Sequence, residues 1–457
     1  MGSSTLDDLR GRVKGTVIAS SDPGYDDARK VHNGMIDRKP LAVVQCAGTP
    51  DVVAAVNYAR EAGLDLSVRG GGHSVPGFGT NDGGIVIDLS KMTAVTVDPA
   101  ARTARAQGGC TWGVFNDATH KHGLATTGGV VSTTGIGGLT LGGGIGYLTR
   151  AFGLSCDNLI SAEVVTADGK VLTASVKEND DLFWALRGGG GNFGVVTTFE
   201  YQLHPVENIY GGPMFFEIDK VRDVFTAYRE IIAGAPRELG AFPAFQIAPP
   251  LPFIPENRHG DTLVAIVGMW AGDVAKGPDA FKAFHDIAPV VAEHVDVMPY
   301  PALNAAFDPL LPPGQQHYWK ANFVKELTDE AIEAHAEHGP KVPFVSSTMH
   351  LYPISGAVHD VMPDETAFAY RDANFATVIA GMWDDPADNV KNTQWVKDYY
   401  AATAPLSEEG GYINFMAGDD QGRIKANYKD NYARLTQIKK AYDPGNLFHM
   451  NQNIKPA

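Results

Sequence analysis

A histidine directly follows three consecutive glycines in the segment Arg69–Ser74, which reads RGGGHS. Consecutive glycines let the backbone approach a ligand closely, and their N–H groups can form a concavity that binds an anion such as a pyrophosphate. The alternative explanation for His73 is a loop histidine without a chemical role. The glycine clusters elsewhere in the chain favour a ligand-binding loop with His73 beside it.

The chain contains 51 glycines, which gather at residues 70–72, 77–84, 128–146 and 188–194. Ordering glycine is entropically costly, so clusters of it inside structured sequence indicate loops that wrap around something large. The four segments therefore predict one extended ligand that several loops share.

Common nucleotide-binding motifs do not account for these glycines. Gly189, Gly191 and Gly194 match G-x-G-x-x-G, but they follow a helix-like stretch and precede a strand. A Rossmann fold needs the reverse order, because the pyrophosphate must meet the N-terminus of a helix. The sequence also contains no G-x-x-x-x-G-K-[ST], H-E-x-x-H or G-x-S-x-G pattern, which removes the main support for P-loop, zinc-protease and hydrolase functions.

Two further histidines, His335 and His338, lie in a charged segment that is predicted to be helical. Short histidine patterns of this kind are weak signals of metal binding. We therefore interpret them as part of a solvated helix face and expect no metal site.

The charge of the chain limits its partners. Lys and Arg number 37 and Asp and Glu number 53, so the net charge is 37 − 53 = −16. Nucleic acids and anionic membranes attract basic surfaces, so we expect neither as a partner.

No apolar run approaches the ~20 residues of a membrane helix, and residues 1–10 show no secretory signal. We expect a cytoplasmic protein of two or three domains, present as a monomer or a homodimer.

Hydrophobic periodicity and turn residues predict the elements that position the loops. Strands are predicted at 42–46, 66–69, 85–89, 95–98, 103–107, 163–166, 170–173 and 195–203, and helices at 49–63, 112–122 and 180–187. Asp168 and Gly169 indicate a hairpin turn between two of these strands. Beyond residue 205 aromatic residues become common; helices are predicted at 221–232, 329–338 and 431–440, and strands at 262–270, 344–352 and 377–383.

Several segments together resemble the berberine bridge enzyme-like group of FAD-linked oxidases, within the vanillyl-alcohol oxidase superfamily, and most of all its 6-hydroxy-D-nicotine oxidase-like bacterial members. The matching segments are Ser67–Ser74, Asp82–Asp88, Gly128–Gly146, Arg150, Gly153–Asn158, Leu182–Gly188, Gly191–Val196, Tyr412–Phe415, Tyr442–Phe448 and Asn451–Ile454. The resemblance implies an α+β fold with a two-part PCMH-type FAD-binding domain and an antiparallel-sheet substrate domain covered by helices. The implied domains are residues 1–205, 206–405 (substrate) and 406–457 (return to the FAD-binding domain).

The resemblance also implies that FAD is bound covalently, through a bond from His73 to the 8-alpha carbon of the flavin. Residues 70–74 would wrap the pyrophosphate, and residues 133–139 and 142–146 would line the flavin. Val195 and Val196 would lie near the adenine half, and Asn451 and Asn453 near the isoalloxazine ring. The implied FAD contacts besides His73 are Arg69, Gly70, Gly71, Gly72, Ser74, Thr133, Thr134, Gly135, Gly138, Leu139, Gly142, Gly143, Gly146, Val195, Val196, Asn451 and Asn453.

The sequence departs from the family pattern at two positions. Many relatives attach the flavin a second time through a cysteine, but Val131 occupies that position here, which predicts a single attachment. Relatives with the pattern Y-x-N-Y use the last tyrosine as a base, and Phe415 replaces it here. The proton acceptor is therefore unassigned. Thr134, which in relatives is the position that controls oxygen access, is compatible with oxidase activity.

Candidate catalytic residues are Tyr412 and Asn414 on one predicted strand, His350 and Tyr352 on another, and the pair Tyr318 and Lys320. Residues two apart on a strand project to the same face of a sheet, so the pairs 318/320 and 350/352 should each share a face. Structural packing is the alternative role for each pair. The phenylalanine-rich run 242–253 predicts either an apolar pocket or core packing.

The resemblance implies an FAD-dependent oxidase that removes a hydride from a C–H bond beside an oxygen or nitrogen of a small alcohol, sugar or amine. Dioxygen would be the second substrate and hydrogen peroxide the product. One alternative is a flavin dehydrogenase with another electron acceptor. Another is a flavoprotein with little turnover, which the missing tyrosine at position 415 suggests.

Overall fold

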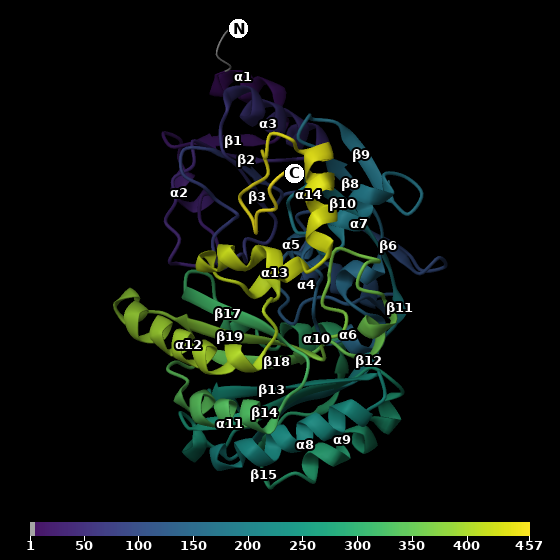
Figure 1. Cartoon of the computed structure of the whole chain (residues 1–457), viewed down its shortest axis with the longest axis vertical. Coiled ribbons are helices and arrows are strands. Elements are labelled where there is room, and N and C mark those ends of the chain that lie inside the picture. The colour runs from purple at the N-terminus through teal and green to yellow at the C-terminus, as the bar shows by residue number, and fades with distance from the viewer. Residues whose placement is uncertain (1–4) are drawn as a thin grey trace.

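The computed structural model describes residues 5–457. Residues 1–4, which fall in the predicted first domain and in the segment where we expect no secretory signal, lie outside the described part. Within residues 5–457 the main sheets have four, five and eight strands, with helices packed against them (Figure 1). This arrangement confirms the predicted α+β fold class.

The four-stranded sheet places the glycine loop that carries His73. Its strand order is β1 (Thr16–Ala19), β2 (Ala42–Gln45), β4 (Ile85–Asp88) and β3 (Leu66–Arg69), with α1 (Leu6–Arg12), α2 (Tyr25–Ala28) and α3 (Thr49–Ala62) around it. Strands β2, β4 and β3 are parallel. The loop after β3 therefore leaves the carboxyl edge of the sheet, where ligands bind in such arrangements.

The five-stranded sheet is antiparallel and supports the second glycine-rich region. Its order is β5 (Val95–Asp98), β6 (Thr103–Gln107), β10 (Val195–Gln202), β8 (Leu159–Val165) and β9 (Val171–Ser175). It is accompanied by α4 (Trp112–His120), α5 (Ile136–Leu141), α6 (Thr149–Phe152) and α7 (Asp180–Leu186), and by the short pair β7 (Leu124–Ala125) and β11 (His204–Pro205). The predicted hairpin is confirmed, because β8 and β9 pair around Gly169, whose φ is +80°.

Helix α5 is a feature that the sequence did not predict, because it lies inside the glycine cluster at 128–146. Its apolar residues Ile136 and Leu141 are buried, and Thr140 exchanges a 2.8 Å hydrogen bond with Tyr201 of β10. Packing against the sheet therefore outweighs the low helix propensity of glycine in this segment.

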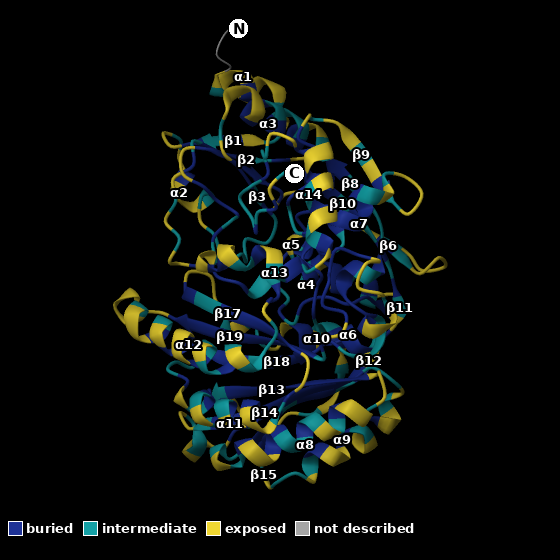
Figure 2. Cartoon of the chain, viewed as in Figure 1, coloured by how far each residue is buried: buried dark blue, intermediate teal, exposed yellow. Residues whose placement is uncertain are grey.

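The eight-stranded sheet is antiparallel and provides the other wall of the site. Its order is β15 (Val290–Glu293), β12 (Asn208–Phe216), β14 (Thr262–Trp270), β13 (Leu239–Ile247), β18 (Thr348–Pro353), β19 (Phe375–Trp383) and β17 (Gln316–Val324), and β16 (Asp296–Pro299) also pairs with β12. Helices α8 (Val221–Gly234), α9 (Gly277–His285), α11 (Asp329–His338) and α12 (Asn389–Thr403) cover one face, and α10 (Tyr300–Ala305) lies near the other. Figure 2 shows that the central strands, such as β13, β14 and β19, are buried while the outer sides of the helices are exposed.

The C-terminal segment returns to the first part of the chain. Helices α13 (Ile424–Tyr428) and α14 (Asn431–Tyr442) follow the eight-stranded sheet in the sequence, and α14 packs beside α7 (Figure 1). The strands of the two smaller sheets come from residues 16–202 and those of the large sheet from 208–383. The domain limits at residues 205 and 405 stay predictions.

The predicted strand at Tyr412–Phe415 is wrong, because Ile413–Phe415 forms a single 3₁₀ turn. The backbone N–H of Phe415 donates to the carbonyl of Tyr412 at 2.9 Å, which closes the turn. In the part of the chain that the structure describes, no helix has the length and apolar character needed to cross a bilayer.

Candidate active site

A cavity of about 320 Å³ lies between the glycine loop after β3, the turn at residues 129–139, the eight-stranded sheet and the C-terminal segment. The sheet contributes side chains from β13, β17, β18 and β19. Residues far apart in the sequence thus meet at one site, and Gly190 and Gly191 complete its wall. The glycine clusters at 70–72, 128–146 and 188–194 all contribute to this one cavity, as the sequence predicted.

Two glycine loops touch so closely that side chains cannot fit between them. A Cβ added to Gly71 would lie 2.3 Å from the backbone nitrogen of Gly135, and one added to Gly135 would lie 2.4 Å from that of Gly71. Gly72 has a φ of +73°, which side-chain-bearing residues rarely adopt. The segment before His73 therefore requires glycine for steric reasons.

Arg69 anchors the start of this loop rather than acting as a free cation. Its guanidinium donates to the Asp88 carboxylate at 2.9 Å and to the carbonyl of Lys30 at 2.9 Å. Asp88 is also its register partner on the neighbouring strand β4. A buried charge is stable only when it is paired in this way, so the pair fixes the point where the loop leaves the sheet.

His73 lines the cavity, and its imidazole is stacked on that of His32, with ring centroids 4.0 Å apart. The ring of His317 also lies near that of His32, with 5.1 Å between centroids. Burial, together with these two imidazoles, lowers the pKa of His73 to about 3. The ring is therefore neutral at physiological pH, and its nitrogen lone pair is available.

The predicted FAD contacts divide into two groups. Those that line the cavity are Arg69, Gly70, Gly71, Gly72, His73, Ser74, Thr134, Gly135, Gly138, Leu139 and Asn451. Those that do not line it are Thr133, Gly142, Gly143, Gly146, Val195, Val196 and Asn453. Their role toward FAD stays a prediction.

Close packing explains why the glycines of the second group are needed. A Cβ on Gly142 would lie 2.2 Å from Oδ1 of Asn414, and a Cβ on Gly146 would lie 1.6 Å from the carbonyl of Gly128. Val195 and Val196 begin β10 and pair with β8, so they belong to the sheet. Both valines are buried in hydrophobic clusters of the core.

Of the predicted catalytic residues, His350, Tyr352 and Asn414 line the cavity. Nδ1 of His350 and the hydroxyl of Tyr352 are 2.6 Å apart. The amide of Asn414 donates to the carbonyl of Leu139 at 3.0 Å and to the hydroxyl of Tyr412 at 2.7 Å. Tyr412 itself lies behind the wall, where its hydroxyl accepts hydrogen bonds from the backbone at residues 144 and 145.

The structure does not bring Tyr318 and Lys320 to the cavity. They share one face of β17, as predicted, but this is the face covered by α12. Tyr318 donates to Asp419 at 2.7 Å, and Lys320 binds Asp419 and Asp420 at 2.8 Å each. Because side chains alternate along a strand, it is Trp319 that points into the cavity. This residue was not among the predicted catalytic residues.

Sequence reasoning also missed His32 and Tyr147. His32 lies outside every glycine cluster, and only the fold brings it against His73. Tyr147 directly follows one of those clusters and lines the cavity. The phenylalanine-rich run 242–253 was predicted to form either an apolar pocket or part of the core, and it does both. Phe242 lines the cavity, while Phe245 is packed in the core beneath α8.

The residues at the cavity fit an FAD molecule. Within residues 5–457 no Asp, Glu or Lys lines the cavity, so nothing there repels a pyrophosphate. The side-chain atoms Asn451 Oδ1, Gln452 Nε2 and Asn453 Oδ1 are buried without a hydrogen-bond partner in the described part of the protein. Buried polar groups are normally paired, so this segment has hydrogen-bonding capacity for a polar ligand.

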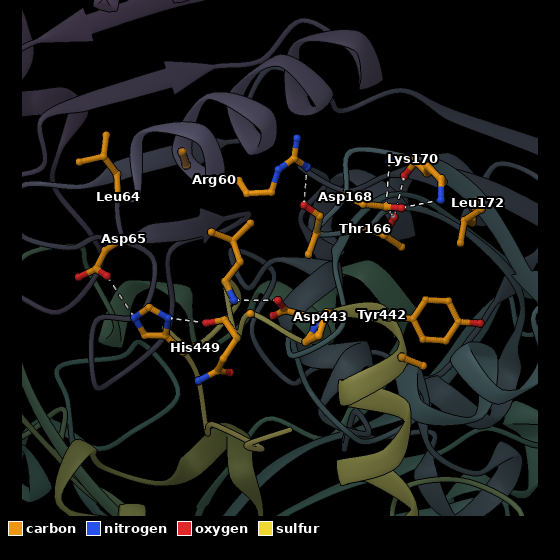
Figure 3. Close-up of a pocket in the computed structure, with 18 residues that line it drawn as sticks. Arg60, Leu64, Asp65, Thr166, Asp168, Lys170, Leu172, Tyr442, Asp443 and His449 are labelled. Carbon is orange, nitrogen blue, oxygen red and sulfur yellow. Dashed lines mark hydrogen bonds and ion pairs between the residues drawn. The ribbon is translucent and has the colours of Figure 1, made fainter. Parts of the chain in front are cut away.

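A second pocket of about 780 Å³ lies between α3, the β8–β9 hairpin and the segment after α14 (Figure 3). Its charged side chains are paired within the protein. Lys170 binds Asp168 at 2.7 Å, and His449 lies 3.3 Å from Asp65. It shares none of the predicted site residues, and we do not assign it to the active site.

His335, in the segment interpreted as a solvated helix face, is instead buried. Its Nδ1 lies 2.7 Å from the hydroxyl of Tyr399 on α12, and its ring packs against Phe225. The interpretation of this histidine as solvated was therefore wrong.

Comparison with known proteins agrees with these features. Residues 40–175 match the family model described as FAD binding domain, and residues 411–455 match that described as berberine and berberine like. An FAD-linked oxidoreductase of Dictyostelium discoideum is 32% identical over 450 residues, covering 97% of this chain and 95% of the relative. (R)-6-hydroxynicotine oxidase of Paenarthrobacter nicotinovorans is 30% identical over 457 residues, covering 97% of each chain.

A solved structure of 6-hydroxy-D-nicotine oxidase from Arthrobacter nicotinovorans has a TM-score of 0.87 at 27% identity, and covers 97% of this chain and 98% of that one. The match extends over both the flavin part and the substrate sheet. The chain therefore belongs to the berberine bridge enzyme-like family of FAD-linked oxidoreductases.

Proposed function

We propose that this protein is an oxidase that holds FAD covalently through His73 alone. It removes a hydride from a C–H bond beside an oxygen or nitrogen of a small organic molecule. The observation that carries this proposal is the place of His73: a neutral imidazole at the cavity, next to backbone that requires glycine and opposite the substrate sheet. When bound, FAD supplies the acceptor for the hydride and passes the electrons to dioxygen, which leaves as hydrogen peroxide.

Single attachment is supported by Val131, which occupies the position where many relatives carry the cysteine that attaches the flavin a second time. Val131 lines the cavity and offers no thiol. Cys110 and Cys156 are fully buried in hydrophobic clusters, and burial raises the pKa of both thiols, which keeps them unreactive. His73 is thus the residue that we expect to carry the flavin.

The residues of this chain would have the following roles. The glycine loop after β3 would bind the pyrophosphate through backbone N–H groups, and the segment 451–453 would hydrogen-bond the polar edge of the ring system. The apolar wall formed by Phe242, Trp319 and Phe415 would hold the substrate and exclude water. The relative (R)-6-hydroxynicotine oxidase acts, as its name states, on 6-hydroxynicotine, which is consistent with a small organic substrate.

The experiment is anaerobic mixing of the purified yellow protein with a panel of small alcohols, sugars and amines, followed by admission of air. We expect a compound that bleaches the flavin absorbance, and return of the absorbance with peroxide release when oxygen enters. Bleaching without reoxidation by oxygen would favour a dehydrogenase instead. A flavin that no compound reduces would contradict the proposed function.

A further inference from the structure

The cavity wall contains few groups that can exchange a proton. Its titratable side chains, within the described residues, are Arg69, His73, Tyr147, His350 and Tyr352. Hydride removal from an alcohol releases the hydroxyl proton, which needs an acceptor close to the reacting carbon. Phe415 occupies the position at which relatives with the pattern Y-x-N-Y carry a basic tyrosine, so these five residues are the candidates for the acceptor.

Four of the five are unsuited to accept the proton. Arg69 is permanently charged and paired with Asp88. Burial raises the pKa of Tyr147 and of Tyr352, so both hydroxyls are protonated and hold no free negative charge. His73 is the residue expected to be bonded to the flavin. Only His350 remains.

The position of His350 suits the role. It lies on β18 two residues before Tyr352, so both project from the same face of the sheet toward the cavity. The 2.6 Å contact between its Nδ1 and the Tyr352 hydroxyl fixes the orientation of the ring. Its Nε2 makes no hydrogen bond within residues 5–457 and is not enclosed by protein. A base held by a third group in this way is a common catalytic arrangement.

We propose that His350, oriented by Tyr352, accepts the hydroxyl proton of an uncharged alcohol substrate with an apolar or aromatic body. This proposal rests on the proposed function and names the substrate class and the proton acceptor for it. The substrate is uncharged because the cavity offers no carboxylate to pair a cation. Its body is apolar because the surrounding wall contains Phe242, Phe307, Trp319 and Phe415.

The reaction balances as the conversion of an alcohol and dioxygen into a carbonyl compound and hydrogen peroxide. The O–H bond of the alcohol breaks, and its proton goes to the imidazole of His350. The C–H bond breaks and its hydrogen leaves with both electrons, a carbon–oxygen double bond forms, and this hydrogen and the electron pair end on dioxygen. His350 later returns its proton to the peroxide. Because burial lowers the pKa of His350 to about 3, the ring starts each turnover unprotonated.

A second buried His–Tyr pair in the same domain provides a matched control. Nδ1 of His335 on α11 lies 2.7 Å from the hydroxyl of Tyr399, and burial lowers the pKa of His335 to about 3 as well. This pair lies on the helix-covered side of the eight-stranded sheet and does not line the cavity. Breaking either pair removes a similar buried contact, but only one pair is placed to take part in the reaction.

The first test needs no substrate. Histidine nitrogens of the flavin-loaded protein are labelled with ¹⁵N, and His350→Gln identifies the signals of residue 350. We expect these signals to report a neutral ring with one unprotonated nitrogen between about pH 5 and pH 8. A doubly protonated ring at pH 7 would overturn the proposal, because such a ring cannot accept a proton.

The second test measures flavin reduction under anaerobic conditions by an alcohol that bleaches the wild-type protein. We expect His350→Gln to slow reduction by about 100-fold or more, the usual contribution of a general base. Tyr352→Phe should give a smaller loss, and His335→Gln should stay within about twofold of wild type. Free imidazole should restore part of the rate in His350→Gly but not in Tyr352→Phe, which a purely structural role would not produce.

The outcomes separate this proposal from the proposed function. Equal reduction rates in wild type and His350→Gln would overturn the role of His350 and leave the oxidase function intact. A wild-type flavin that is bleached by amines or charged sugars but by no neutral alcohol would overturn the substrate class alone. A flavin that nothing reduces would overturn the proposed function itself.

Discussion

The imidazole of His32 lies flat against the imidazole of His73, with centroids 4.0 Å apart and an angle of 19° between the ring planes. The backbone on either side holds this stack in place. The backbone N–H of His32 donates to the carbonyl of Gly72 at 3.1 Å, and the backbone carbonyl of His32 accepts from the N–H of Gly314 at 2.9 Å. The loop that carries His73 and the segment before β17 are thus joined through His32, beside the residue that is expected to carry the cofactor.

The stack should assist attachment of the flavin by orienting the His73 ring. His32→Ala removes the stacking partner, so we expect the covalently bound fraction of FAD to fall well below that of wild type. His32→Phe keeps a flat ring and should retain most of the attachment. Flavin fluorescence of the denatured protein on a gel measures this fraction. An alanine variant with full attachment would show that the stack has no such role.

Stability should decrease as the solution becomes acidic. Burial lowers the pKa of five histidines to about 3 or 4, namely His32, His73, His317, His335 and His350. Below about pH 6.5 the unfolded chain binds protons that the folded protein does not, so the free energy of unfolding falls between about pH 6.5 and pH 4.

Each fully buried histidine contributes up to about 1.4 kcal/mol per pH unit in that range. Urea unfolding at several pH values measures the slope. His335→Gln should make it shallower, because this histidine is only 2% exposed. A slope that stays the same in the variant would contradict the assignment of a lowered pKa to His335.

Gly138 tests whether FAD fills the cavity. A Cβ added at this residue of α5 meets no protein atom within 4 Å, yet Gly138 lines the cavity. We expect Gly138→Ala to fold normally and to bind FAD less tightly, because the methyl group would occupy ligand space. Gly11→Ala, whose added Cβ also meets no atom, is the control and lies outside the cavity. Equal flavin content in both variants would argue against FAD at this wall.

The buried Lys439–Asp443 ion pair should be needed for the flavin site. The ammonium group donates to Asp443 at 2.7 Å and to the carbonyls of Asn192 and Phe448, and neither side chain of the pair is exposed. Lys439→Met would leave an unpaired buried carboxylate, which costs about 3–5 kcal/mol. We expect a much lower melting temperature and a smaller fraction of the protein with incorporated flavin.

The exposed pair of Lys170 and Asp168 is the control for that variant (Figure 3). Surface ion pairs contribute about 0–1 kcal/mol, so Lys170→Met should leave both melting temperature and flavin content almost unchanged. Similar losses in the two lysine variants would contradict the special role of the buried pair.

The sequence predicted those features that depend on local patterns. Helix α11 and strand β14 have the predicted limits, and the glycine clusters converge on one cavity. The pair His350 and Tyr352 was placed on one face of a strand, because alternation along a strand is a local property. The resemblance to the family supplied the fold class and the FAD.

Other features depend on tertiary contacts and were not predictable. Alternation alone does not say which face of β17 meets the cavity, so Tyr318 and Lys320 were selected instead of Trp319. Helix α5 forms inside a glycine cluster because the sheet beneath it buries its apolar side. The stack of His32 on His73 joins residues 41 positions apart, with no motif that connects them.

The central claim is that FAD is bound covalently to His73 and to no other residue. The most direct measurement is mass spectrometry of the peptides from acid-precipitated wild-type protein, with His73→Ala as the comparison. The account predicts that FAD stays in the pellet, that its mass is found on the peptide that contains His73, and that the variant releases it. Release of all FAD from the wild-type protein by acid, or attachment to any other residue, would contradict the account.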